Sequence, residues 1–308
     1  MHRYEIIYPS TNSINYSKPI TALVLQPDHV GPETGVMLFT HGWGGNRFQH
    51  EDKMVEVADR YNLIAMSVEY RQSGYDFDPV AGRGAYRPYD ASFLQVLDVL
   101  NGLRTLLRER PMIDRRRLYH YGGSQGGHIA LLSAVYAPKT FAWIYVSCPL
   151  THLDDRVQDW AGRWFAPHEL AARDVLALAS RIDCPIYLEY GDADNVVDCE
   201  AHARRLIPKL EAVGRLARCV CYPGGGHDLA PTTTKLQAFR AMAAHLPWGA
   251  RREDEDSFAS GSCIELPAAE YRLQIDWSRP TDAADLLNWY PASPDASCSS
   301  IRPPLAMR

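Results

Sequence analysis

The serine at position 124 lies in a run of glycines, Tyr-Gly-Gly-Ser-Gln-Gly-Gly. Gly122, Ser124 and Gly126 form the pattern G-x-S-x-G, which follows a strand-like run at 117–121 and precedes a helix-forming run at 129–136. Small residues on either side of a serine permit a sharp strand-to-helix turn that exposes its hydroxyl. The free N–H groups at the start of the helix favour negative charge beside it. The pattern therefore predicts that Ser124 is a nucleophile.

A serine hydroxyl reacts well only when a base removes its proton, and the base needs a carboxylate to orient it. Two loops that follow strand-like runs offer these groups, Gly-Asp-Ala-Asp-Asn-Val-Val at 191–197 and Pro-Gly-Gly-Gly-His-Asp at 223–228. Of the eleven histidines, only His227 lies just beyond the final core strand, in a glycine-rich loop that can fold over the serine. We predict that His227 is the base and that Asp192 or Asp194 is the acid.

Hydrolysis of an acyl compound also needs two hydrogen-bond donors for the oxyanion. The N–H of Gln125, at the mouth of the helix after the serine, is predicted to be one donor. The second is expected from the loop His-Gly-Trp-Gly-Gly at 41–45, whose glycines allow N–H groups to turn toward the serine. Trp43 is the predicted donor there. His41 precedes the serine and is interpreted as structural.

Alternating strand-like and helix-like segments from about residue 35 onward predict an α/β fold, with a mostly parallel, doubly wound sheet covered on both faces. The predicted strands are Tyr4–Tyr8, Ile20–Leu25, Gly35–Thr40, Leu63–Val68, Arg117–Tyr121, Phe141–Val146, Pro185–Tyr190 and Leu216–Tyr222. The predicted helices are Asp52–Arg60, Ala91–Arg108, Ile129–Tyr136, Glu200–Val213 and Thr233–His245. The first two strands are expected to form an antiparallel edge.

Two insertions interrupt this alternation where strands end, which is where ligands bind in such sheets. One is the aromatic and arginine-rich loop 70–90, and the other is a predicted helical cap at about 149–180. The predicted contacts to substrate are Tyr70, Arg71, Trp160 and Trp164, with Arg83 and Arg87 as further arginines of the loop. Pairing of these arginines with nearby aspartates is the competing interpretation.

The chain is predicted to consist of one domain, residues 1–248, followed by a partly ordered C-terminal extension, residues 249–308. Within the extension, residues 264–277 could add a strand or pack on the body, and residues 293–308 are expected to be poorly ordered.

Composition limits the functions open to this chain of 308 residues. The net charge of −5 gives no electrostatic basis for binding nucleic acid or an anionic membrane. No signal-peptide core or run of about 18 apolar residues is found, so no membrane association is expected. The seven cysteines are odd in number and contain no C-x-x-C pair, which favours a reducing cytoplasm over a disulfide framework. No metal or cofactor is predicted, and a homo-oligomer stays open.

These motifs resemble those of the α/β-hydrolase superfamily from about residue 20 to 247, and most closely the cephalosporin-C deacetylase and acetyl xylan esterase family. The turn that carries the nucleophile in that family, the elbow G-x-S-Q-G, is matched at 122–126. The H-G-aromatic loop of the family is matched at 41–43. The pattern G-x-x-D-x-x-V is matched by Gly191, Asp194 and Val197. The resemblance thus implies an α/β-hydrolase fold and favours Asp194 over Asp192 as the acid.

The sequence therefore predicts a cytoplasmic serine hydrolase that uses no metal or organic cofactor. Its expected substrate is a small polar or sugar-like molecule that carries an acetyl or other short acyl ester. Two alternatives stay open. One is a peptidase or amidase, since prolyl-oligopeptidase-like enzymes share the elbow, and the other is a non-catalytic binding protein on the same fold.

Overall fold

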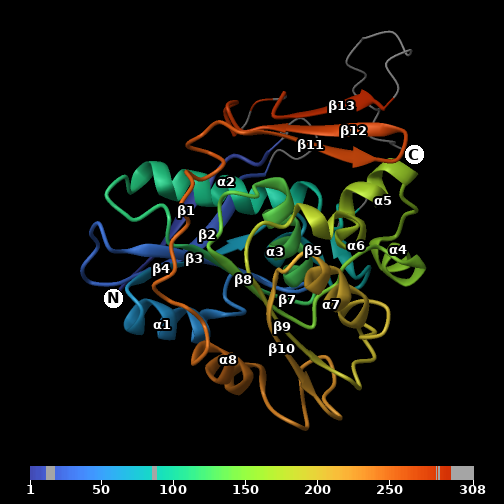
Figure 1. The fold of residues 1–308 in the computed structure, drawn as a ribbon, viewed down its shortest axis with the longest axis horizontal. Helices are drawn as coiled ribbons and strands as arrows, with labels where there is room; N and C mark the ends of the chain where they lie inside the picture. The colour runs from blue at the N-terminus through green and yellow to red at the C-terminus, as the bar shows by residue number, and fades with distance from the viewer. Residues whose placement is uncertain (12–17, 85–88, 282, 284, 293–308) are drawn as a thin grey trace.

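The computed structural model describes residues 1–11, 18–84, 89–281, 283 and 285–292 (Figure 1). Its central sheet has eight strands in the order β1-β2-β4-β3-β7-β8-β9-β10. β1 and β2 pair antiparallel and β2 pairs antiparallel with β4, whereas all pairs from β4 to β10 are parallel. The strand bounds are β1 His2–Tyr8, β2 Ile20–Gln26, β3 Gly35–Thr40, β4 Leu63–Glu69, β7 Leu118–Gly123, β8 Trp143–Ser147, β9 Ile186–Gly191 and β10 Leu216–Tyr222. The mostly parallel sheet and its antiparallel edge agree with the prediction.

Helices cover both faces of this sheet, because the strands β3, β4, β7, β8 and β9 are buried along nearly their whole length and need apolar cover on each side. One face packs against α1 (Glu51–Arg60) and α8 (Lys235–Ala243). The other packs against α2 (Leu94–Glu109), α3 (Gln125–Tyr136) and α7 (Ala203–Ala212). Figure 1 shows the two helical layers on opposite sides of the sheet. Because the strands from β4 to β10 in the sheet order are parallel, their carboxyl ends meet at one edge of the sheet.

The five helices that were predicted start one to four residues away from the predicted positions, and the starts of α2 and α3 bear on the site. Ala91 and Ser92 have positive φ angles of 51° and 76°, so α2 begins at Leu94 rather than at Ala91. Helix α3 begins at Gln125, directly after the serine, so its first turn contains the glycines that follow Ser124. The first free N–H groups of α3 consequently lie beside the predicted nucleophile.

The two predicted insertions contain short elements. The loop at 70–90 holds η1 (Gly74–Asp76) and a hairpin of β5 (Phe77–Asp78) and β6 (Arg83–Gly84), which the sequence did not predict. The cap contains α4 (Asp155–Ala161), α5 (Pro167–Arg173), α6 (Val175–Leu178) and η2 (Ala179–Arg181). Arg173 ties the cap to the body, since its guanidinium donates to the backbone oxygens of Asp90 and Ala91.

The C-terminal extension forms a second sheet, and it does not extend the first. β11 (Cys263–Ala268), β12 (Tyr271–Asp276) and β13 (Leu287–Pro291) pair antiparallel and lie above α2 in Figure 1. The indole N–H of Trp277 donates to the backbone oxygen of Tyr136 at 2.8 Å, and an Arg104 N–H donates to that of Trp277 at 3.0 Å. The expectation of disorder at 293–308 lies outside the described residues. Among those described, no helix is long and apolar enough to cross a membrane.

Candidate active site

Ser124 occupies the turn between β7 and α3 with φ 57° and ψ −125°. Residues other than glycine rarely adopt this backbone conformation, so contacts with the surrounding structure must offset its strain. The Ser124 N–H donates to the Ser147 oxygen at 2.9 Å, and its carbonyl accepts from the N–H groups of Gly127 and His128 at 3.0 and 3.2 Å. These bonds fix the turn between two strands and a helix. The side chain is partly exposed.

The glycines of the elbow are needed because backbones approach closely around it. A Cβ on Gly122 would lie 2.1 Å from the Gly126 oxygen, and one on Gly126 would lie 2.0 Å from the Thr40 oxygen. The Thr40 hydroxyl donates to the Gly126 oxygen at 2.8 Å. The start of α3 therefore packs directly against the end of β3, the strand that leads into the loop at 41–45.

His227 forms a hydrogen bond with Asp194 and not with Asp192. The distance from His227 Nδ1 to Asp194 Oδ2 is 2.7 Å. The other Asp194 oxygen accepts from the N–H groups of Val196 and Val197 at 2.9 and 2.8 Å. Burial favours a higher pKa for Asp194, but the hydrogen bonds from His227 and these N–H groups outweigh it and hold the pKa below its usual value.

The ionised Asp194 carboxylate accepts a hydrogen bond from Nδ1–H of His227, and this tautomer leaves Nε2 of the ring free to accept a proton. Asp192 has a different place: it is exposed, and its Oδ1 accepts from the Gly224 N–H at 2.6 Å. It thus joins the loop of Asp194 to the loop of His227.

The loop after β3 lies against the serine. A Cβ on Gly42 would be 3.4 Å from the Ser124 Cβ, and the Gly45 N–H closes a turn onto the Gly42 oxygen at 3.0 Å. The N–H of Trp43 finds no acceptor within the described part of the chain, which suits a donor for an oxyanion. His41 is fully buried, and burial lowers its pKa to about 4. It is therefore neutral, and its ring donates to the Gly42 oxygen at 2.9 Å.

The positions of Tyr70 and Arg71 argue against the predicted contacts to substrate. Tyr70 is 1% exposed, stacks on the His41 ring at 4.1 Å and donates from its hydroxyl to the His41 oxygen at 3.0 Å. Arg71 is 3% exposed, and its guanidinium binds both carboxylate oxygens of Asp98 at 2.7 and 2.8 Å. The Tyr70 side chain thus packs on the loop after β3, and the Arg71 side chain binds α2, so both stabilise the structure beneath the site. Asp98 lies on α2, and only folding brings it to Arg71.

The cap and the insertion place aromatic rings around the oxyanion loop. Trp43 packs on Tyr89 at a centroid distance of 4.2 Å and meets Trp160 edge-on at 6.0 Å. The Trp43 indole N–H donates to the Gly82 oxygen at 2.7 Å, and the Tyr89 hydroxyl donates to the side-chain oxygen of Gln125 at 2.8 Å. Trp160, from α4, thus reaches the site.

The other predicted substrate contacts, Trp164 and the loop arginines Arg83 and Arg87, do not form one group. Trp164 is 66% exposed and joins none of the ring contacts found among the described residues. Arg83 lies against the cap, where a Cβ on Gly162 would meet its guanidinium carbon at 2.4 Å. Arg87 lies outside the described residues.

Cys148 and Glu189 belong to none of the sequence motifs. Cys148 follows β8, and its sulfur, an Asp194 oxygen and a His227 ring nitrogen lie within 4.8 Å of one another. Its position after a predicted strand was the available signal. Glu189 is buried on β9, and burial raises its pKa to about 7. One of its oxygens has no partner in the described part of the protein.

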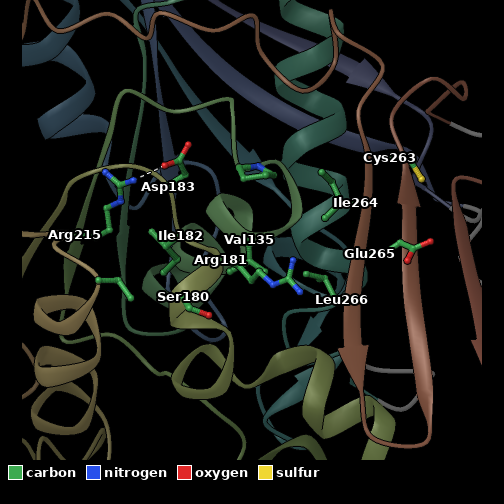
Figure 2. A pocket seen from close by; sticks show the side chains of 12 residues that line it. Val135, Ser180, Arg181, Ile182, Asp183, Arg215, Cys263, Ile264, Glu265 and Leu266 are labelled. Atoms are coloured by element: carbon green, nitrogen blue, oxygen red, sulfur yellow. Dashed lines mark hydrogen bonds and ion pairs between the residues drawn. The ribbon is translucent and has the colours of Figure 1, made fainter. Parts of the chain in front are cut away.

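A cavity of about 410 Å³ lies elsewhere, between the segment 180–183 and β11 (Figure 2). Its lining includes the Arg215–Asp183 ion pair, whose atoms are 2.5 Å apart. Both residues precede strands, so this cavity is at the amino ends of β9 and β10, whereas Ser124 follows the carboxyl end of β7. The cavity is therefore separate from the candidate active site.

Comparison with known proteins identifies the family. Residues 94–249, half of the chain, match the prolyl oligopeptidase family. The chain belongs to this family of α/β-hydrolases. The predicted superfamily and fold are thereby confirmed, and the protein is a serine-type hydrolase.

Individual relatives include both esterases and peptidases. The chain is 30% identical over 152 residues to acetyl esterase Axe7A of Xylanibacter ruminicola, a match that covers 45% of this chain and 33% of that protein. Acylaminoacyl peptidase of Pyrococcus horikoshii has a TM-score of 0.64 at 15% identity, over 82% of this chain and 42% of that one. Esterase 2 of Thermogutta terrifontis has a TM-score of 0.59 at 14% identity, over 79% and 93%. The chain thus spans about a third of the curated relative, and the structural likenesses concern the fold alone.

Proposed function

We propose that this protein hydrolyses carboxylic esters of acetyl or other short acyl groups on small polar or sugar-like molecules. The observation that carries this proposal is the 2.7 Å hydrogen bond between His227 and Asp194, at the sheet edge where Ser124 occupies its strained turn. This combination of nucleophile, base and orienting acid is what acyl transfer requires. The relative named as an acetyl esterase supports the ester as the bond cleaved.

In the proposed mechanism, Ser124 attacks the ester carbonyl while Nε2 of His227 takes its proton. Asp194 holds the ring in the required tautomer and stabilises the imidazolium that forms. His227 then returns the proton to the leaving alcohol. Water, activated by the same histidine, hydrolyses the acyl-enzyme and restores the serine. No step needs a metal or an organic cofactor.

The N–H groups of Trp43 and Gln125 are proposed to bind the oxyanion. Gln125 is the first residue of α3, so its N–H has no partner within the helix. Each such donor contributes about 3 kcal/mol to stabilising the transition state. The contacts of the Trp43 indole and of the Gln125 side chain hold these two backbone groups in place before substrate binds.

The surroundings of the site favour a neutral or acidic substrate. Trp43 and Trp160, both partly exposed, offer ring faces of the kind that pack on sugar or acyl groups. Arg83 contacts the cap at Gly162, and the guanidinium of Arg156 lies 5.0 Å from the centre of the Trp160 ring. A cation beside the Trp160 ring and a second one on the cap suit hydroxyl-rich or carboxylate groups better than the ammonium group of a free peptide N-terminus.

The second candidate function is a peptidase or amidase, which the family match and the acylaminoacyl peptidase likeness favour. The same three side chains would perform that reaction. The two functions differ in the leaving group, an alcohol or an amine, and in what binds beside the scissile bond.

The test is labelling with a fluorophosphonate, followed by rates on a matched panel of acetylated sugars, short and long aryl esters and aminoacyl amides. We expect labelling of the wild type, none of Ser124→Ala, and the highest kcat/KM on acetyl esters. Higher kcat/KM on amides would select the peptidase. Failure of the wild type to react with the label or with any substrate would favour a binding protein on this fold.

A further inference from the structure

Three side chains that commonly bind metal ions meet at the candidate active site. The sulfur of Cys148, a carboxylate oxygen of Asp194 and a ring nitrogen of His227 all lie within 4.8 Å of one another. They follow β8, β9 and β10, so three adjacent strands of the sheet fix their positions. The hydrolytic mechanism uses Asp194 and His227 but gives the thiol no role.

We propose that this set is an inhibitory site for zinc and similar thiophilic divalent cations. Cysteine, histidine and aspartate are its usual protein ligands, at about 2.0–2.3 Å in tetrahedral geometry. Such bonds place ligand atoms about 3.5 Å apart. No two of the three atoms would therefore have to approach by much more than 1 Å, and His227 Nδ1 and Asp194 Oδ2, now 2.7 Å apart, would separate by less than 1 Å if both bind the ion. Three protein ligands leave one tetrahedral position for water.

The site is accessible from the side of the histidine. The His227 side chain is 21% exposed, whereas Cys148 is buried and packs against Leu229 and Ala238. A metal ion would thus enter beside His227 and meet the thiol behind it. Burial raises the pKa of Cys148 to about 12, so without metal the thiol is neutral. When zinc binds, the thiol transfers its proton to solvent and the thiolate coordinates the ion.

Zinc at this position would stop hydrolysis, a consequence that rests on the function proposed above, whereas binding itself does not. Coordination through Nδ1 of His227 would replace the proton shared with Asp194, which orients the ring. Coordination through Nε2 would occupy the lone pair that accepts the serine proton. In either case the base is lost, and removal of the metal restores it.

The first experiment measures ester hydrolysis against Zn²⁺ concentration in a buffer without chelator. Cys148→Ser and Cys148→Ala are compared with Cys184→Ala, a control at another buried cysteine that precedes β9. Each rate is expressed relative to the metal-free rate of the same variant. We expect the half-inhibiting concentration to rise at least tenfold in both Cys148 variants and to stay unchanged in the control, with full recovery in EDTA. Equal zinc sensitivity of all four proteins would overturn the inference.

The second experiment separates binding from turnover. Co²⁺ is titrated into Ser124→Ala, and the thiolate-to-cobalt charge-transfer absorption is measured with and without the added change Cys148→Ser. We expect the band only where Cys148 is present. Its absence from both proteins would refute the metal site whatever the enzyme hydrolyses. Its presence, together with a wild type that has no hydrolase activity, would uphold the metal site and refute the proposed function.

Discussion

Replacing Gly126 by alanine tests whether the elbow depends on close backbone packing. The added Cβ would lie 2.0 Å from the Thr40 oxygen and 2.5 Å from the His41 oxygen, where ordinary contacts begin near 3.4 Å. Both obstacles are backbone atoms, so no side-chain rotation removes the clash. Helix α3 and the end of β3 must separate by more than 1 Å.

That separation moves Ser124 and Gln125, which α3 carries, away from the loop of Trp43. A displacement of about 1 Å in a catalytic group costs roughly 100-fold in rate. Overpacking of this kind also lowers the free energy of unfolding by about 1–3 kcal/mol. We expect Gly126→Ala to lose at least 100-fold in kcat/KM and to melt at a lower temperature.

Gly123→Ala is the matched control, since it adds the same methyl group to another glycine of the elbow, directly before Ser124. The nearest atom to its Cβ would be the Ser147 oxygen at 3.8 Å, an ordinary contact. We expect this variant to fold and to retain activity within a few-fold of wild type. The measurements are kcat/KM on an aryl acetate and thermal unfolding by circular dichroism. Wild-type rates and melting in Gly126→Ala, or equal losses in both variants, would refute the packing argument.

Three further predictions concern the acid, acid stability and substrate recognition. Asp194→Asn should lower kcat by about 10⁴-fold, because His227 loses the partner that fixes its tautomer. Asp192→Asn should lower kcat less than tenfold, and the reverse order in matched kinetics would show that the wrong aspartate was chosen. Burial lowers the pKa of His120 and His128 in the folded protein to about 3, whereas a histidine in the unfolded chain has a pKa of about 6.5. As the pH falls below about 6.5, the unfolded chain therefore binds protons that the folded protein does not. Stability should thus be fully present above that pH and fall by about 2 kcal/mol per histidine at pH 5, and equal urea midpoints at pH 7.5 and 5 would contradict this. Arg83→Ala should raise KM for acidic or sugar acetates several-fold and leave neutral aryl acetates unaffected; unchanged KM for both classes would remove Arg83 from substrate recognition.

The sequence predicted the elements that local patterns determine. The elbow around Ser124 and the glycine-rich loop of His227 each have a motif that follows a strand. Strand-like runs between helix-like runs placed all eight strands of the main sheet. Which aspartate meets His227 depended on family resemblance, because Asp192 and Asp194 share one turn and only the folded loops separate them.

Contacts between distant segments could not be predicted in the same way. Arg71 has aspartates close by in sequence, yet its partner is Asp98 on α2, and Tyr70 turns inward onto His41. The β11–β13 sheet needs a third strand that the C-terminal sequence signals only weakly. Cys148 becomes relevant only when the ends of β8, β9 and β10 are adjacent.

The most direct test of the proposed mechanism is to identify the residue that a fluorophosphonate modifies and to measure how the rate of this labelling depends on His227. We expect mass spectrometry of the labelled wild type to place one adduct on the peptide that contains Ser124. His227→Ala should react at least 1,000-fold more slowly, because the hydroxyl then lacks a base. Modification of a different residue, or an equal labelling rate in His227→Ala, would contradict the assignment of Ser124 and His227 as nucleophile and base.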